Sequence, residues 1–80
     1  MRVLFLGKIA ELAGPERALD LPEGATVADA AARLSAEHAA LGALLSAPST
    51  VYILDDAVAK ADACLDGARE LAFLPPVSGG

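Results

Sequence analysis

The sequence predicts an α+β fold in which one main helix packs on one face of a mixed sheet of four to five strands. Short apolar segments, each containing a phenylalanine, occur near both ends of the 80-residue chain, a pattern typical of buried strands. A single well-marked helix, rich in alanine, lies between them. The order is a strand pair, a helix and returning strands, which places the helix against one sheet.

The first strand is expected at residues 3–6, which form a continuous apolar segment. Residues 8–13 have helical spacing for one or two turns and are followed by Gly14 and Pro15, a pair that stops a helix. Side chains alternate in character over residues 17–21, which predicts a second strand with one exposed face.

The main helix is expected from residue 27 to about residue 37. Thr26 followed three residues later by Asp29 is the signature of an N-cap. Residues at three- and four-residue spacing predict the face that packs on the sheet. They are Val27, Ala30, Ala31, Leu34 and His38.

Leu41, Leu44 and Leu45 repeat at helical spacing and predict a second short helix. The remaining elements are expected, in order, as a strand at 50–54, a turn at 55–56, a weak strand at 57–59, a turn at 66–67 and a last strand at 70–74. Because the first and last strands are the most apolar, we expect them side by side in the middle of the sheet.

The chain is acidic, with 6 Lys and Arg against 11 Asp and Glu and a formal net charge of −5. An acidic surface repels phosphate backbones, so nucleic-acid binding is not expected. The longest uncharged stretch, residues 39–54, contains Gly42 and Pro48 and does not predict a membrane span. We expect a cytoplasmic protein with no membrane partner.

No side-chain arrangement typical of an enzyme is recognisable in the sequence. Cys64 is the single cysteine, so neither an intramolecular disulfide nor a zinc cluster is expected. Its acidic neighbours argue against a reactive thiol, and we expect it to be half-buried. His38 is expected to be solvated or to cap a helix. Asp55 and Asp56 are adjacent and should diverge, so no metal site is predicted.

The last six residues form a separate feature, which divides the chain into a domain at 1–74 and a tail at 75–80. Pro75 and Pro76 lack an N–H group, so the sheet must stop there and the chain is held extended. Val77 is an apolar anchor, and Gly79 and Gly80 leave only backbone and a carboxylate at the tip. Such an arm, at most about 20 Å long, can carry its carboxylate into a partner's active site for activation by ATP.

Three stretches of sequence together carry a family resemblance. Residues 72–80, which read AFLPPVSGG, resemble the ending of the small, sulfur-carrying subunit of molybdopterin synthase. Residues 1–14 resemble the opening of that family, and residues 21–29 resemble its passage from strand to helix. The resemblance implies the ubiquitin-like β-grasp fold, in agreement with the element order.

The resemblance also implies a function in molybdenum cofactor biosynthesis. An adenylyltransferase similar to ubiquitin-activating enzymes would use ATP to adenylate the carboxylate of Gly80, which a sulfur donor then converts to a thiocarboxylate. Two such carriers, in a heterotetramer with the large catalytic subunit, would deliver sulfur to a cyclic pyranopterin precursor. The carrier itself would be non-catalytic and would bind no cofactor. The residues expected to insert into the large subunit are Pro75, Pro76, Val77, Ser78 and Gly79.

A docking surface is expected on the second face of the sheet. The helix can cover only one face, so some apolar strand residues must point outward, and an exposed apolar patch usually marks an interface. We predict that Leu6, Val58 and Leu74 form part of the surface that binds the large subunit. The alternative is that a loop covers them.

Two other functions remain open. One is a different group carrier, either a sulfur carrier for thiamine or cysteine synthesis or a ubiquitin-like modifier attached to lysines. The other is a non-covalent interaction module in which the tail is incidental. Deletion of Gly79 and Gly80 separates the last of these from the rest, because a module would keep its activity.

Overall fold

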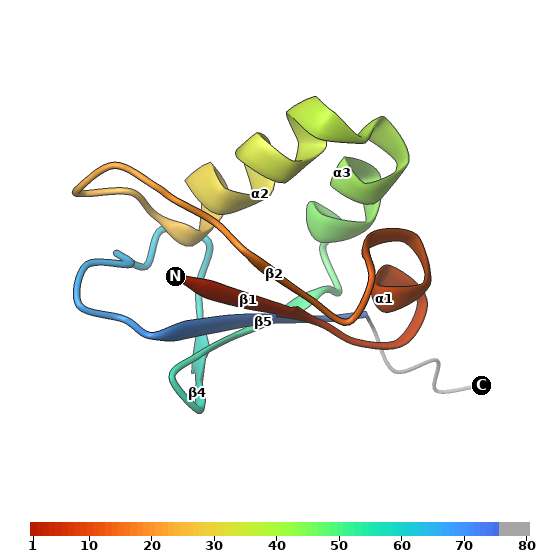
Figure 1. Ribbon diagram of the computed structural model, residues 1–80. Coiled ribbons are helices and arrows are strands. Elements are labelled where there is room, and N and C mark those ends of the chain that lie inside the picture. The colour runs from red at the N-terminus through yellow and green to blue at the C-terminus, as the bar shows by residue number, and fades with distance from the viewer. Residues whose placement is uncertain (76–80) are drawn as a thin grey trace.

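Five strands form one mixed sheet, and three helices cover one of its faces in the computed structural model, which describes residues 1–75 (Figure 1). Over these residues, no helix is long and apolar enough to cross a membrane. The elements are, in order, β1 (Arg2–Phe5), α1 (Gly7–Ala13), β2 (Glu16–Ala18), α2 (Val27–Glu37), α3 (Ala39–Leu45), β3 (Val51–Leu54), β4 (Ala57–Ala59) and β5 (Glu70–Leu74).

The strand order is β2-β1-β5-β3-β4, so the first and last predicted strands lie side by side and β5 is central. β1 and β5 are parallel, whereas the other neighbouring pairs are antiparallel. This architecture is the ubiquitin-like β-grasp fold, as predicted. The sheet has five strands, and α2 is the longest of the helices packed against it.

The first two strands differ from the prediction at their ends. β1 ends at Phe5 because Leu6 becomes the N-cap of α1. β2 spans only three residues rather than 17–21. Its pairing ends with two hydrogen bonds between Met1 and Leu19, and residues 20–21 face no partner strand. Leu19 then turns its side chain into the core.

The predicted capping box sets the start of α2. The Asp29 N–H donates to Thr26 Oγ1 at 3.2 Å, and the Thr26 N–H donates to Asp29 Oδ2 at 2.8 Å. The prediction that His38 belongs to the buried face was wrong, because the helix ends at Glu37 and its periodicity stops there. His38 is exposed and extended, and its Nδ1 accepts from the Leu41 N–H at 3.3 Å, which caps α3.

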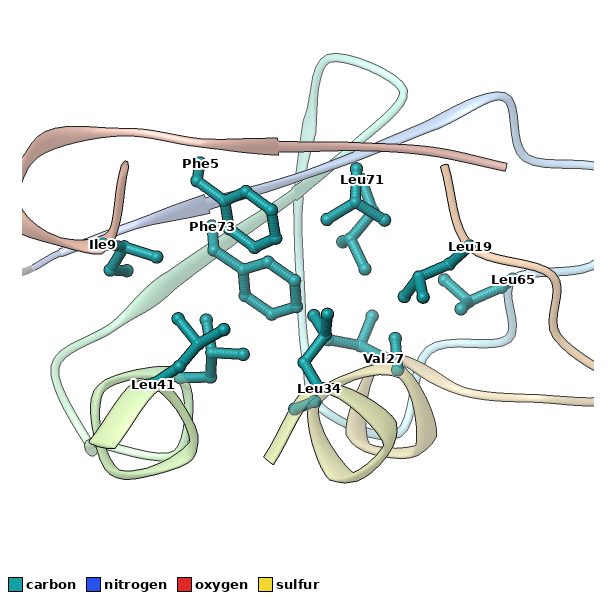
Figure 2. Close-up of a cluster of buried hydrophobic side chains, with 13 residues drawn as sticks. Phe5, Ile9, Leu19, Val27, Leu34, Leu41, Leu65, Leu71 and Phe73 are labelled. Carbon is teal, nitrogen blue, oxygen red and sulfur yellow. The ribbon is translucent and has the colours of Figure 1, made fainter. Parts of the chain in front are cut away.

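The core lies between the sheet and the helices. Figure 2 shows Phe5, Phe73 and Leu71 pointing from the sheet toward Leu34 and Leu41 on the helices. Phe73 and Leu34 have no exposed surface. Burial of these side chains holds β5 in the middle of the sheet.

Candidate functional site

The C-terminal end of β5 is the point from which the predicted tail leaves the domain. Phe73, one residue before the strand ends, stacks on Phe5 with ring centroids 6.0 Å apart and meets Tyr52 edge-on at 5.6 Å. The Leu6 N–H donates to the Phe73 carbonyl oxygen at 3.2 Å. Neighbours on both sides therefore fix the strand that carries the tail.

β5 ends at Leu74, where the prediction placed its end. Pro75 follows, is half-buried and has no N–H with which to extend the sheet. The other predicted tail residues lie outside the described residues: Pro76, Val77, Ser78, Gly79 and Gly80. Their insertion into a partner and the chemistry of Gly80 stay predictions.

The face of the sheet opposite the helices, here called the open face, carries an apolar patch. Paired residues on neighbouring strands share a face. The pairs Leu4–Ala72, Ala72–Ile53, Ile53–Val58 and Val51–Leu74 are in register. They lie opposite to Phe73 and Leu71, which point into the core. Leu6 continues the alternation of β1 because its backbone is extended.

The structure brings the three predicted docking residues to this open face. Leu6 and Leu74 lie at the C-terminal end of β5, and Val58 lies two strands away on the edge strand β4. Leu6 is 43% exposed and Val58 is 77% exposed. Whether a partner binds them stays a prediction.

Sequence reasoning missed the residues that connect these three. Val51 and Ile53 on β3 lie between Leu74 and Val58, and Val51 is 37% exposed. Val51 and Ile53 are two residues apart in the predicted strand, and this spacing indicates that they share one face of the sheet. With them, the patch extends over Leu4, Leu6, Val51, Ile53, Val58, Ala72 and Leu74.

Charged side chains lie at the other end of the open face. Arg2 Nε lies 2.9 Å from Glu16 Oε2, and an Arg2 guanidinium nitrogen lies 3.8 Å from Glu70 Oε2. These ion pairs join β1 to β2 and to β5. They lie at the start of β5, at the opposite end of the strand from Leu74. The open face is thus apolar toward the tail and charged away from it.

Other candidate residues take no part in this site. The prediction that Cys64 is half-buried was wrong, because it lies exposed in a loop that pairs with Thr26 through backbone only. Asp55 and Asp56 form the predicted turn between β3 and β4. In residues 1–75, no three His, Cys, Asp or Glu side chains are grouped as a metal site.

Comparison with solved structures gives close matches over almost the whole chain. SAMP1 from Haloferax volcanii matches with a TM-score of 0.79 and 28% identity, over 99% of this chain and 97% of that one. A second structure, of H. volcanii small archaeal modifier protein 1, has a TM-score of 0.79 and 26% identity, over 95% of each chain. A Pyrococcus furiosus protein described as molybdopterin converting factor, subunit 1, has a TM-score of 0.81 and 22% identity, over 95% of each chain.

A comparison with protein families agrees with the structural matches. The family described as ThiS matches residues 3–80, so the match includes both the described domain and the tail.

Proposed function

This chain belongs to the ThiS family, and on that premise we propose that it is the sulfur-carrying small subunit of molybdopterin synthase. It is a ubiquitin-like protein of the kind that serves as a sulfur carrier or as a modifier. One observation carries the proposal. The central strand β5, anchored on both sides, leads directly into the sequence Pro-Pro-Val-Ser-Gly-Gly. That ending resembles the ending of the molybdopterin synthase subunit.

The proposed chemistry takes place at the carboxylate of Gly80. A carboxylate oxygen attacks the α-phosphorus of ATP on the activating enzyme, and pyrophosphate leaves. A sulfide-level donor then attacks the acyl carbon, AMP leaves, and a thiocarboxylate remains. On the large subunit, the sulfur attacks a carbon of the pterin precursor and displaces the oxygen substituent bound there. Water then cleaves the acyl–sulfur bond, which restores the carboxylate and leaves the sulfur on the pterin. The small chain presents the group and its partners supply the catalytic side chains.

The open-face patch is proposed as the docking surface for the large subunit. Leu6 and Leu74 lie beside the end of β5, so a partner seated there would also receive the tail. Val58 would form the outer edge of the contact, since it is the most exposed large apolar side chain among the described residues. Burial of exposed apolar side chains favours association.

The mass of the intact protein tests the proposal. The chain is incubated with ATP, the adenylating enzyme and a sulfide donor. Replacement of one oxygen atom by sulfur is expected, and a chain lacking Gly80 should show no change. With the large subunit and the pyranopterin precursor added, the charged chain should yield the dithiolene product. A thiocarboxylate that forms but gives no dithiolene would move the assignment to another sulfur carrier, such as that for thiamine.

A modifier function is the second candidate, and the likeness to the small archaeal modifier protein favours it. That protein matches over 99% of this chain at 28% identity. A modifier would form an amide bond between Gly80 and a lysine of a target protein. Arg69 is the last basic residue of the chain, so trypsin would leave residues 70–80 attached to each modified lysine. Peptide mapping of cell proteins would then find this remnant on lysines, and it would vanish when Gly80 is deleted. Their absence, together with thiocarboxylate formation, would favour the carrier.

A further inference from the structure

We propose that Gly7 is a positioning residue that sets the direction in which the chain leaves β5. The inference rests on the proposed function, because direction matters only if the tail is delivered into a partner. It is carried by a contact between Gly7 and Pro75, residues 68 positions apart in sequence that meet where α1 lies beside the end of β5 (Figure 1).

The backbone brings Gly7 to this place. Leu6 is extended and donates its N–H to the Phe73 carbonyl oxygen. Gly7 then turns the chain into α1 with a φ of +54°, a conformation that side-chain-bearing residues rarely adopt. Leu6 and Gly7 therefore contact the residues on either side of Leu74, the last residue of β5.

The space at Gly7 is filled by the proline ring. A Cβ atom built on Gly7 would lie 2.7 Å from Pro75 Cγ and 3.4 Å from Pro75 Cδ. Proline cannot rotate these atoms away, because its ring closes on its own backbone nitrogen. Any side chain at residue 7 would therefore displace Pro75 itself.

The contact of the Pro75 ring with Gly7 fixes the point at which the chain leaves β5. The ring fixes φ of Pro75, so a ring held against Gly7 also restricts the backbone direction at Pro75. A partner that takes the tail into a narrow active site requires the reacting carboxylate at a defined place. Small misplacements there are costly, since about 1 Å can reduce a rate by roughly a hundred-fold.

Other glycines of the chain provide matched controls. Gly14, Gly24 and Gly67 also have positive φ angles, at 88°, 83° and 78°, but a Cβ atom on any of them would have nothing within 4 Å. Alanine at these positions meets an unfavourable backbone conformation without touching the tail. Gly14 is the best control, because it ends the helix that Gly7 begins.

The test compares Gly7→Ala with Gly14→Ala in the full chain, with ATP and the adenylating enzyme. Pyrophosphate release is measured at varied carrier concentration. Gly7→Ala should lower kcat about ten-fold or more, with KM within about two-fold, since the exposed side chains that an enzyme could bind are unchanged while the reacting carboxylate is misplaced. Gly14→Ala should keep the wild-type kcat. Equal effects of the two variants would overturn the proposal.

A double variant separates the contact from backbone strain. Pro75→Ala removes Cγ and Cδ, so Gly7→Ala should have little further effect on kcat in that background. An unchanged effect would assign the loss to strain alone and overturn the proposal.

One further measurement does not depend on the proposed function. A nuclear Overhauser effect between Gly7 Hα and the Pro75 ring should be present in the wild-type protein, and its absence would contradict the geometry. If the wild-type chain is not adenylated by a competent enzyme, the proposed function fails while this measurement still decides the contact.

Discussion

Asp55 joins two parts of the sheet through its side chain. With Asp56 it forms the two-residue turn between β3 and β4, and both residues have positive φ, at 46° and 70°. Aspartate tolerates this conformation better than most residues. The Asp55 carboxylate also accepts the Arg69 N–H at 3.0 Å and the Glu70 N–H at 2.9 Å. One side chain therefore connects the hairpin to the start of the central strand.

Asp55→Ala is expected to lower the free energy of unfolding by about 1–2 kcal/mol, because two backbone N–H groups lose a charged acceptor. Asp56→Ala is the matched control, since it also places alanine at a positive φ but leaves those two bonds intact. Urea unfolding of the two variants measures the difference. Equal losses would show that the backbone conformation, and not the hydrogen bonds, matters at this turn.

At the scale of elements, α2 and α3 pack closely because α3 contains a buried glycine. A Cβ atom on Gly42 would lie 2.0 Å from Ser35 Oγ and 2.9 Å from Ser35 Cα. The hydroxyl could rotate, but Cα belongs to the backbone of α2 and moves only with the helix. The glycine thus sets how closely the two helices approach.

Gly42→Ala is expected to destabilise the protein by about 1–3 kcal/mol through overpacking. This sign is opposite to that expected from helix propensity, which favours alanine over glycine by about 1 kcal/mol. Chemical unfolding measures the change, and Ala43→Gly at a neighbouring exposed position provides the propensity effect alone. A stabilised Gly42→Ala protein would contradict the close packing of α2 and α3.

The elements that could be predicted from sequence are those with local signals. The start of α2 follows from Thr26 and Asp29, which bond within one turn. The short extent of β2 could not be predicted, because it depends on where β1 stops offering partners. Long-range pairing decides such strand ends. His38 was wrongly placed on the buried face because its spacing from Leu34 fits the apolar stripe, although it follows the end of α2. The other expectation for His38, that it caps a helix, is confirmed at the start of α3.

At the scale of the whole molecule, the apolar patch of the open face lies beside the end of β5. The sequence predicted apolar residues on both faces and the neighbouring position of the first and last strands. It did not reveal that Val51 and Ile53 complete the patch. The alternation of side chains along a strand shows which residues share a face, but it does not show which face of the sheet the helices cover. The role of Gly7 was also not visible, because its contact partner is remote in sequence.

Leu6→Asp is expected to weaken binding to the large subunit about ten-fold or more, because a charge would then enter an apolar contact. Leu12→Asp is the matched control, since Leu12 is 44% exposed and Leu6 is 43% exposed, but Leu12 lies on α1 rather than on the open face. Aspartate is a favourable N-cap residue, so Leu6→Asp should still fold. Calorimetric titration compares the affinities, and equal affinities would place the docking surface elsewhere.

The central position of β5 has a consequence for synthesis of the protein. β5 follows the other strands along the chain yet lies between β1 and β3. On the ribosome, the β1–β2 and β3–β4 pairs emerge first and have nothing to join them until residues 70–74 appear. A chain whose synthesis has not passed residue 74 therefore has two separate strand pairs and no closed sheet. The domain is expected to fold only after β5 has been made, rather than strand by strand as the chain emerges.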